Sequence, residues 1–161
     1  MATFFTADTH FGDAPLVQRR RVIFGSVEAH DEALIARWNT VVGVADEVWH
    51  LGDFAAGASR AHCAAVFARL NGIKRLVRGN HDTNRVLELP WTEPPLESAR
   101  ITVKDTNGSA WRLYLSHYPH RSCRASGGKH AISMAIPMPA FQIRVVPATL
   151  GPMPATTVQS N

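Results

Sequence analysis

Side chains of the types that bind metal ions follow several strand-like segments of this chain. They offer carboxylate, imidazole and amide groups and no thiolate, a set that suits Mn, Fe, Zn or a similar divalent ion. The candidate ligands are Asp8, His10, Asp53, Asn80 and His117. Each short motif alone is weak, because Asp-x-His occurs by chance and Gly-Asp is common in turns. Their repetition at the ends of successive strands is what indicates a metal site.

The chemistry that such ligands support is the hydrolysis of phosphate esters. An aspartate shared by two ions, about 3.5 to 4 Å apart, makes a centre that polarises a phosphoryl group and lowers the pKa of a bound water molecule. The ligands can form such a centre only if the strands that carry them end at one place. In an open α/β sheet, that place is the crevice beyond the carboxyl ends of the strands.

The first half of the chain predicts alternating strands and helices. Runs of strand-forming residues cover positions 3–7, 47–51 and 73–77. Ser26 is an N-cap candidate for a helix with apolar residues at helical spacing as far as Val42. A second helix is expected from about Ser59 to Leu70. This order predicts an α/β fold in which the strands pair in parallel.

After Pro90 the pattern becomes that of a β-hairpin. Residues 101–103 and 111–115 are rich in strand formers and flank a turn centred on Asn107 and Gly108. The second of these runs leads directly to His117.

Length and composition indicate one domain with a core of ordinary apolar content. No apolar run reaches the roughly 18 residues of a membrane span and no leader pattern is present, so a cytoplasmic location without a membrane partner is expected. Cys63 and Cys123 lack the spacing of a zinc site, and Cys63 is expected to be an inert buried thiol. His50 is expected to be structural.

The formal net charge of +4 is unevenly distributed. All thirteen acidic residues lie at or before Asp105, and the remaining segment carries five basic residues. A nucleic-acid-binding module that uses Arg19–Arg21, Lys74, Arg75, Arg78 and the basic tail is one alternative, which steep salt dependence of binding would support. Because the excess charge belongs to the tail, and Arg19–Arg21 are expected to form a solvated or phosphate-facing loop, nucleic acid is expected only as a substrate.

The motifs together resemble those of the calcineurin-like metallophosphoesterases, over residues 1 to about 121. They are Asp8-x-His10, Gly52-Asp53, Gly79-Asn80-His81-Asp82 and His117. The resemblance implies a four-layer α/β/β/α sandwich and a hydrolase of phosphate esters with a dinuclear centre of manganese or similar ions. The substrate, whether a monoester or a diester, stays open, as do the metal and the oligomeric state.

The same resemblance assigns roles to the site residues. Asp8, His10 and Asp53 would bind the first ion. Asp53, Asn80 and His117 would bind the second, with Asp53 bridging. His81 would contact the phosphate and protonate the leaving group, for which an imidazole is suited. Asp82 would orient His81.

The chain departs from the family pattern after the hairpin. The family continues to a Gly-His-x-His motif that supplies one ligand to each ion, but no histidine follows His130 here. Codons for Ser133–Pro139, read from the third base of the serine codon, can spell Tyr-Gly-His-Ser-His-Ala. We therefore hypothesise a single-base slip between about Ser122 and Ala131, which resequencing the gene there would test; a natural divergent tail is the alternative.

Residues 122–161 are expected to form an atypical, Pro-rich tail that is poorly ordered. Without the two histidines, the activity of this version of the enzyme is in doubt. A noncatalytic metal-binding or scaffold protein that keeps the fold is the alternative function.

Overall fold

The computed structural model describes residues 1–19, 24–104, 108–118, 131–134 and 144–145. The helices are α1 (Ala14–Arg19), α2 (Val27–Val41), α3 (Arg60–Arg69) and α4 (Asn84–Leu87). The strands are β1 (Thr3–Thr6), β2 (Glu47–His50), β3 (Ile73–Leu76), β4 (Ala99–Lys104), β5 (Ala110–Leu115), β6 (Ala131–Met134) and β7 (Arg144–Val145).

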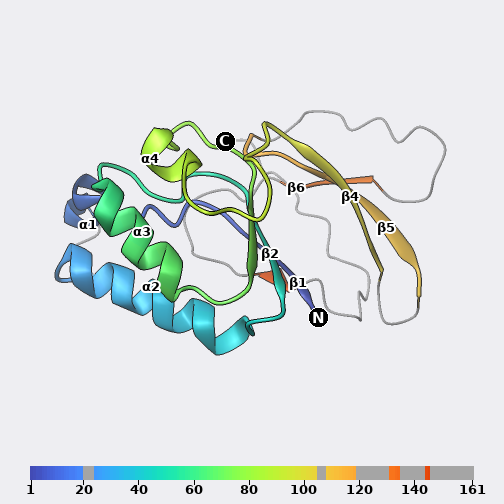
Figure 1. Cartoon of the computed structure of the whole chain (residues 1–161), viewed down its shortest axis with the longest axis horizontal. Helices are drawn as coiled ribbons and strands as arrows, with labels where there is room; N and C mark the ends of the chain where they lie inside the picture. The colour runs from blue at the N-terminus through green and yellow to red at the C-terminus, as the bar shows by residue number, and fades with distance from the viewer. Residues whose placement is uncertain (20–23, 105–107, 119–130, 135–143, 146–161) are drawn as a thin grey trace, which may run out of the picture.

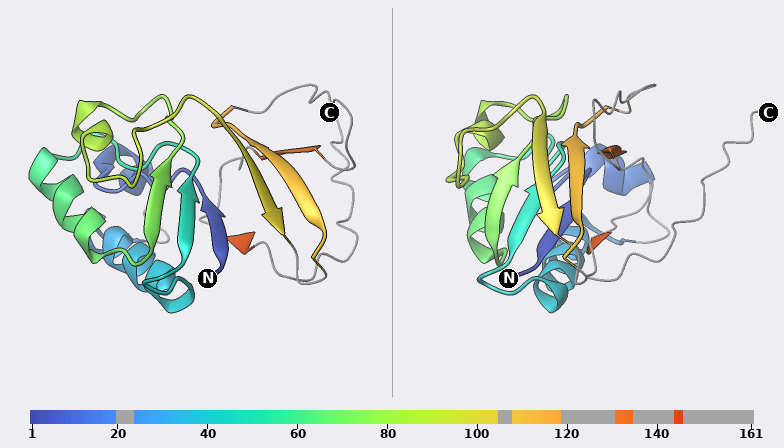
Figure 2. Two further views of the ribbon diagram at one scale, coloured as in Figure 1. Left: turned by 45° about the vertical axis from the view of Figure 1, so that its right-hand side comes forward. Right: turned by 90° about the vertical axis from the view of Figure 1, so that its right-hand side faces the viewer.

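These strands form two sheets. The first has the order β3-β2-β1-β7, in which β1, β2 and β3 are parallel and β7 is antiparallel to β1. The second has the order β4-β5-β6, in which β4 and β5 are antiparallel and β6 is parallel to β5. The helices lie on one side of the first sheet and the second sheet lies on its other side (Figure 1). Figure 2 shows the same three layers from two further directions.

Alternate residues of the central strands face two different cores. Phe4 of β1 is buried in the core that the helices cover, with Trp38 of α2. The next residue, Phe5, is buried between the two sheets, with Leu115 of β5. Because successive side chains of a strand point to opposite faces, a strand covered on both faces must be apolar at nearly every position. This explains why β1 reads as an uninterrupted run of strand formers.

The two long helices begin where the sequence predicts. The Ser26 hydroxyl accepts a hydrogen bond from the Ala29 N–H at 3.1 Å, and the Ser59 hydroxyl accepts one from the His62 N–H at 3.1 Å. Each serine therefore caps an otherwise unpaired amide of the first turn. The Trp38 indole donates to the Asn71 carbonyl at 3.0 Å, which ties α2 to the turn before β3.

The mixed α/β class, the parallel pairing of β1, β2 and β3, and the hairpin of β4 and β5 confirm the predictions. The short helices α1 and α4 were not predicted. Arg19, expected in a loop, is the last residue of α1 and donates to the Pro15 carbonyl at 3.3 Å. None of the described helices is both long and apolar enough to cross a membrane.

Of the expected tail, residues 122–161, the structure describes only β6 and β7. Its other residues, with Cys123 and nearly all of the region expected to contain the slip, lie outside the described part of the chain. The poor order expected for them stays a prediction.

Candidate metal centre

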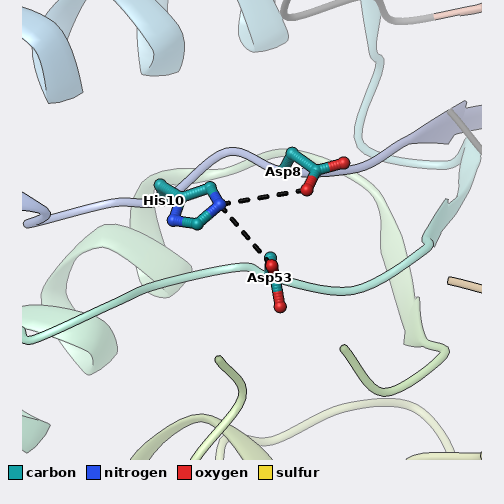
Figure 3. Close-up of side chains that lie close together, drawn as sticks. All are labelled: Asp8, His10 and Asp53. Atoms are coloured by element: carbon teal, nitrogen blue, oxygen red, sulfur yellow. Dashed lines mark ion pairs between the residues drawn. The ribbon is translucent and has the colours of Figure 1, made fainter. Parts of the chain in front are cut away.

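The loops that follow β1 and β2 run side by side at the carboxyl end of the first sheet. The Asp8 N–H donates to the Gly52 carbonyl at 2.9 Å, and the His10 N–H donates to the Asp53 carbonyl at 3.0 Å. Because β1 and β2 are parallel, both strands deliver the residues after them to the same edge. Figure 3 shows the side chains of Asp8, His10 and Asp53 converging there.

Asp8, His10 and Asp53 form a group that could hold a metal ion, since one ligand atom from each lies within 4.8 Å of the others. The His10 Nε2 atom is 3.8 Å from Asp8 Oδ1 and 3.6 Å from Asp53 Oδ2 (Figure 3). It is buried and has no hydrogen-bond partner among the residues that the structure describes. An unpaired nitrogen that faces two carboxylates suits a cation, which would bind all three.

The other ring nitrogen of His10 is engaged by Asp13. The Nδ1 atom lies 3.0 Å from Asp13 Oδ2, and Asp13 Oδ1 accepts a hydrogen bond from the Leu16 N–H at 2.9 Å. A carboxylate on Nδ1 favours the tautomer in which Nε2 carries the lone pair, the usual support of a metal-bound histidine. Burial disfavours the charged imidazole, but the carboxylates of Asp8, Asp53 and Asp13 outweigh it and raise the pKa of His10.

His117 and Asn80 stand on the other side of Asp53. His117 Nε2 is 3.0 Å from Asn80 Oδ1 and 3.6 Å from Asp53 Oδ2. His117 Nδ1 lies 2.9 Å from the Leu51 carbonyl, to which it donates in the neutral tautomer. The lone pair of Nε2 then faces two oxygen acceptors, an arrangement that a proton or a cation stabilises.

The carboxylate of Asp53 therefore lies between two imidazoles. Its Oδ2 atom is 3.6 Å from Nε2 of His10 and 3.6 Å from Nε2 of His117. The structure thus brings together all the ligands that the sequence predicts, from the ends of β1, β2, β3 and β5.

The backbone of three of these residues adopts a conformation that is rare outside glycine. Asp8, His10 and Asp53 have φ angles of 54°, 48° and 58°, and they are the only non-glycine residues with positive φ in the described part of the chain. Such residues cost of order 1 kcal/mol or more each and cluster at functional sites. Here the left-handed backbone turns the chain sharply after each strand, so that the side chains face each other.

Two glycines allow the loops to approach so closely. Gly52 has a φ of 95°, and a Cβ placed on it would lie 2.6 Å from Nδ1 of His117. A Cβ on Gly79 would overlap the carboxylate of Asp53. Both glycines are therefore required by space, and Gly52 is required by its left-handed backbone as well.

His81 lies beside this group and points out of the core. Its side chain is exposed, and its ring centroid is 5.2 Å from that of His10. Its backbone N–H donates to Asp53 Oδ1 at 2.8 Å.

The structure gives Asp82 a different role from the one expected. Its buried carboxylate accepts hydrogen bonds from the backbone N–H groups of Asp53 at 2.9 Å, Phe54 at 2.9 Å and Gly79 at 2.8 Å. Both oxygens are thus engaged by backbone, and none of these contacts involves the His81 ring. Burial raises the pKa of Asp82 although the amides act to lower it. Asp82 fastens the loop after β3 to the loop after β2.

His50 is a buried core histidine, as the sequence predicts. Its Nε2 atom lies 2.9 Å from the Thr9 hydroxyl, which in turn donates to the Phe54 carbonyl at 2.8 Å. Its ring stacks on Trp38 with centroids 6.4 Å apart. Burial, reinforced by the nearby imidazoles of His10 and His117, lowers the pKa of His50 to about 3.

Cys63 is buried and free, and burial raises the pKa of its thiol, which agrees with an inert cysteine.

Sequence reasoning missed two supporting aspartates, Asp13 and Asp31. Asp31 is buried in α2 and accepts from the Gly12 N–H at 3.1 Å, with His30 Nδ1 at 2.8 Å and His62 Nε2 at 2.7 Å also on its oxygens. It ties the loop after β1 to α2 and α3. The position of Asp13, three residues after His10, could have indicated that it supports this histidine. No sequence pattern indicated the role of Asp31.

Comparisons with known proteins give relatives without a stated activity. No protein-family model matches the chain. It is 33% identical over 143 residues to the Gene 66 protein of Mycobacterium phage L5, and this alignment covers 80% of this chain and 68% of that protein. The Gene 66 protein of Mycobacterium phage D29 is 35% identical over 129 residues, covering 73% of this chain and 63% of that protein. An uncharacterized protein of Methanocaldococcus jannaschii is 36% identical over 80 residues, or 49% of this chain and 46% of that protein.

A solved structure of a protein of unknown function from Aquifex aeolicus is similar with a TM-score of 0.56 and 24% identity, over 73% of this chain and 61% of that one. This likeness concerns the fold alone. On the identity and the shared length with the phage L5 protein, the chain belongs to the family of the mycobacteriophage Gene 66 proteins.

Proposed function

We propose that this chain is a metal-dependent phosphoesterase of the calcineurin-like type, with a dinuclear centre at the carboxyl ends of β1, β2, β3 and β5. The observation that carries the proposal is the position of Asp53 Oδ2, 3.6 Å from Nε2 of both His10 and His117. One carboxylate oxygen between two imidazoles from separate strands is what a bridging ligand requires.

The donor set supports a pair of divalent cations. Asp8 and His10 complete the first group of ligands around Asp53, and Asn80 and His117 complete the second. The unpaired Nε2 of His10 and the left-handed backbone of Asp8, His10 and Asp53 are features that a bound cation would explain.

Bound there, the cations would polarise a phosphoryl group and lower the pKa of a coordinated water molecule. His81 would protonate the oxygen that leaves when water attacks phosphorus and the P–O bond breaks. Its exposed imidazole stands beside the ring of His10, and its backbone N–H is held by Asp53 at 2.8 Å. Imidazole is the side chain that most often serves as a general acid. Asp82 holds the loop that positions it.

We also propose that the complete fold is a four-layer sandwich. The helices, the first sheet and the second sheet account for three layers, and a helical layer on the outer face of the second sheet would be the fourth. Strand β6 bears on the hypothesis of a base slip, because it is parallel to β5 with Met134 opposite Leu115. Its carboxyl end therefore lies at the same edge as His117, where a following Gly-His-x-His segment would be needed.

The test is manganese-dependent hydrolysis of bis-p-nitrophenyl phosphate by the chain as printed and by a frame-repaired version, with His81→Ala of the repaired version as the blank. Turnover by the repaired chain alone supports both the assignment and the slip. Equal activity of the two chains would show that our account of the tail is wrong.

The second candidate is a noncatalytic metal-binding protein, which the lack of any histidine after His130 favours. Stoichiometric binding of manganese by both versions without turnover by either would support it and overturn the first proposal.

A further inference from the structure

Tyr118 is an aromatic side chain at the rim of the metal centre. It is 59% exposed and is the only aromatic residue among the exposed large hydrophobic side chains of the described residues. The aromatic side chains of the two cores are buried, except Trp111, which is partly buried. An exposed ring beside a candidate catalytic centre is available to whatever binds there.

The position of Tyr118 is fixed by its neighbours. Its ring stands edge-on against that of His117, with centroids 4.9 Å apart and an angle of 73° between the planes. The Ser116 hydroxyl donates to the Tyr118 carbonyl at 3.0 Å, which holds the backbone at the end of β5. These two contacts set the position of the phenol just after β5.

The Tyr118 hydroxyl reaches the ligand oxygen of Asn80, to which it donates at 3.3 Å. His117 Nε2 lies 3.0 Å from that same oxygen. His81 stands on the other side, beside His10. The space next to Asp53 is therefore flanked by an imidazole on the His10 side and by a phenol on the Asn80 side.

We propose that the Tyr118 hydroxyl donates a hydrogen bond to a non-bridging oxygen of the phosphoryl group bound at this centre, and that Tyr118 is a catalytic residue. The inference rests on the proposed function. A cation on Asn80 Oδ1 would compete for the acceptor that the phenol now uses, and an anionic phosphoryl oxygen is a stronger acceptor than a neutral amide. A donor fixed before the substrate arrives needs little reorganisation.

The experiment compares the full chain with Tyr118→Phe, which keeps the ring and removes the hydroxyl. Calorimetry first measures Mn²⁺ affinity and then the affinity of the Mn²⁺-loaded protein for inorganic phosphate. Tyr114→Phe is the matched control. Tyr114 is the other tyrosine of the chain, and it lies within β5, opposite Arg100 of β4, rather than after the end of the strand. We expect Tyr118→Phe to bind Mn²⁺ within about twofold of the unchanged chain and phosphate about tenfold or more weakly, the loss typical of a hydrogen bond to a charged group.

Equal phosphate affinity of Tyr118→Phe and the unchanged chain would overturn this inference alone. So would an equal loss of Mn²⁺ and phosphate affinity, since Tyr118 would then act by supporting Asn80. A phosphate affinity that falls as far in Tyr114→Phe would overturn it as well. If the unchanged chain binds no Mn²⁺, the same comparison is made in the frame-repaired chain. Absence of Mn²⁺ binding by both chains would overturn the metal centre, and with it the proposed function and this inference.

Discussion

The two ends of the first sheet differ in the partners of their carboxylates. At the amino end of β2, Glu47 is paired with Arg75 of β3 at 2.7 Å, and Arg75 also pairs with Glu93. At the carboxyl end, the only ion-pair partners of Asp8 and Asp53 among the described residues are the imidazoles of His10 and His117, at 3.6 to 3.8 Å. A carboxylate paired with an arginine already has its counter-charge, whereas carboxylates gathered without a fixed cation indicate a site that takes one from solution.

Asp53→Asn tests the difference between the two ends most directly and should have the largest effect. Loss of the carboxylate shared by both groups of ligands should weaken Mn²⁺ binding by more than the about 10 to 100-fold typical of losses outside the ligand shell. Glu47→Gln, at the opposite end of β2, is the control and should leave Mn²⁺ affinity unchanged. Calorimetric titration measures both. Similar losses in the two variants would mean that the ends of the sheet do not differ as proposed.

Gly79→Ala tests whether the loops must approach so closely. A Cβ there would overlap the Asp53 carboxylate, and overpacking of this kind typically destabilises a protein by about 1 to 3 kcal/mol. Gly25→Ala is the matched control, since a Cβ on Gly25 would meet nothing within 4 Å. Urea denaturation gives the free energy of unfolding of each variant. A Gly79→Ala protein as stable as the control would contradict the packing described for the two loops.

The pH dependence of stability tests whether His50 is neutral in the folded protein. The folded-state pKa of His50 is about 3, below the ordinary 6.5, so as pH falls the unfolded chain takes up a proton that the folded chain does not. Stability from this group is complete above about pH 6.5 and is lost as pH falls, by about 2 kcal/mol between pH 7.5 and 5. His50→Gln, which keeps a donor for Thr9, should lose less over that range in urea titrations. Equal losses would rule out a neutral buried His50.

Asp13→Asn tests the support of His10 and should have the smallest effect. The amide oxygen can still accept from His10 Nδ1, but it is a weaker acceptor than the carboxylate. It therefore favours the tautomer with the proton on Nδ1 less strongly, and Mn²⁺ affinity should fall about tenfold. Nitrogen chemical shifts of the His10 ring report the tautomer independently of metal binding. If neither the tautomer nor the Mn²⁺ affinity changes, Asp13 does not support His10, and its role is limited to its hydrogen bond with the Leu16 N–H.

The sequence predicted which side chains gather at the candidate site because these residues lie in unbroken local patterns. Asp8, Asp53 and Asn80 each follow a strand that its strand-forming residues identify, and parallel strands must end at one edge. The loop-fastening roles of Asp82 and Asp31 could not be predicted, since they depend on partners remote along the chain: the backbone amides of Asp53 and Phe54 for Asp82, and the Gly12 amide and His62 for Asp31. Helices α1 and α4 are too short to display a hydrophobic period.

The left-handed backbone of Asp8, His10 and Asp53 has an evolutionary consequence. Glycine would adopt these φ angles without strain but would bind no cation. At each position, the side chain that favours metal binding therefore lowers the stability of the fold. In a lineage that no longer needed the cation, replacements that relax the backbone would be favoured. Retention of all three side chains in a homologue is therefore a record of continued selection on the site rather than on the fold.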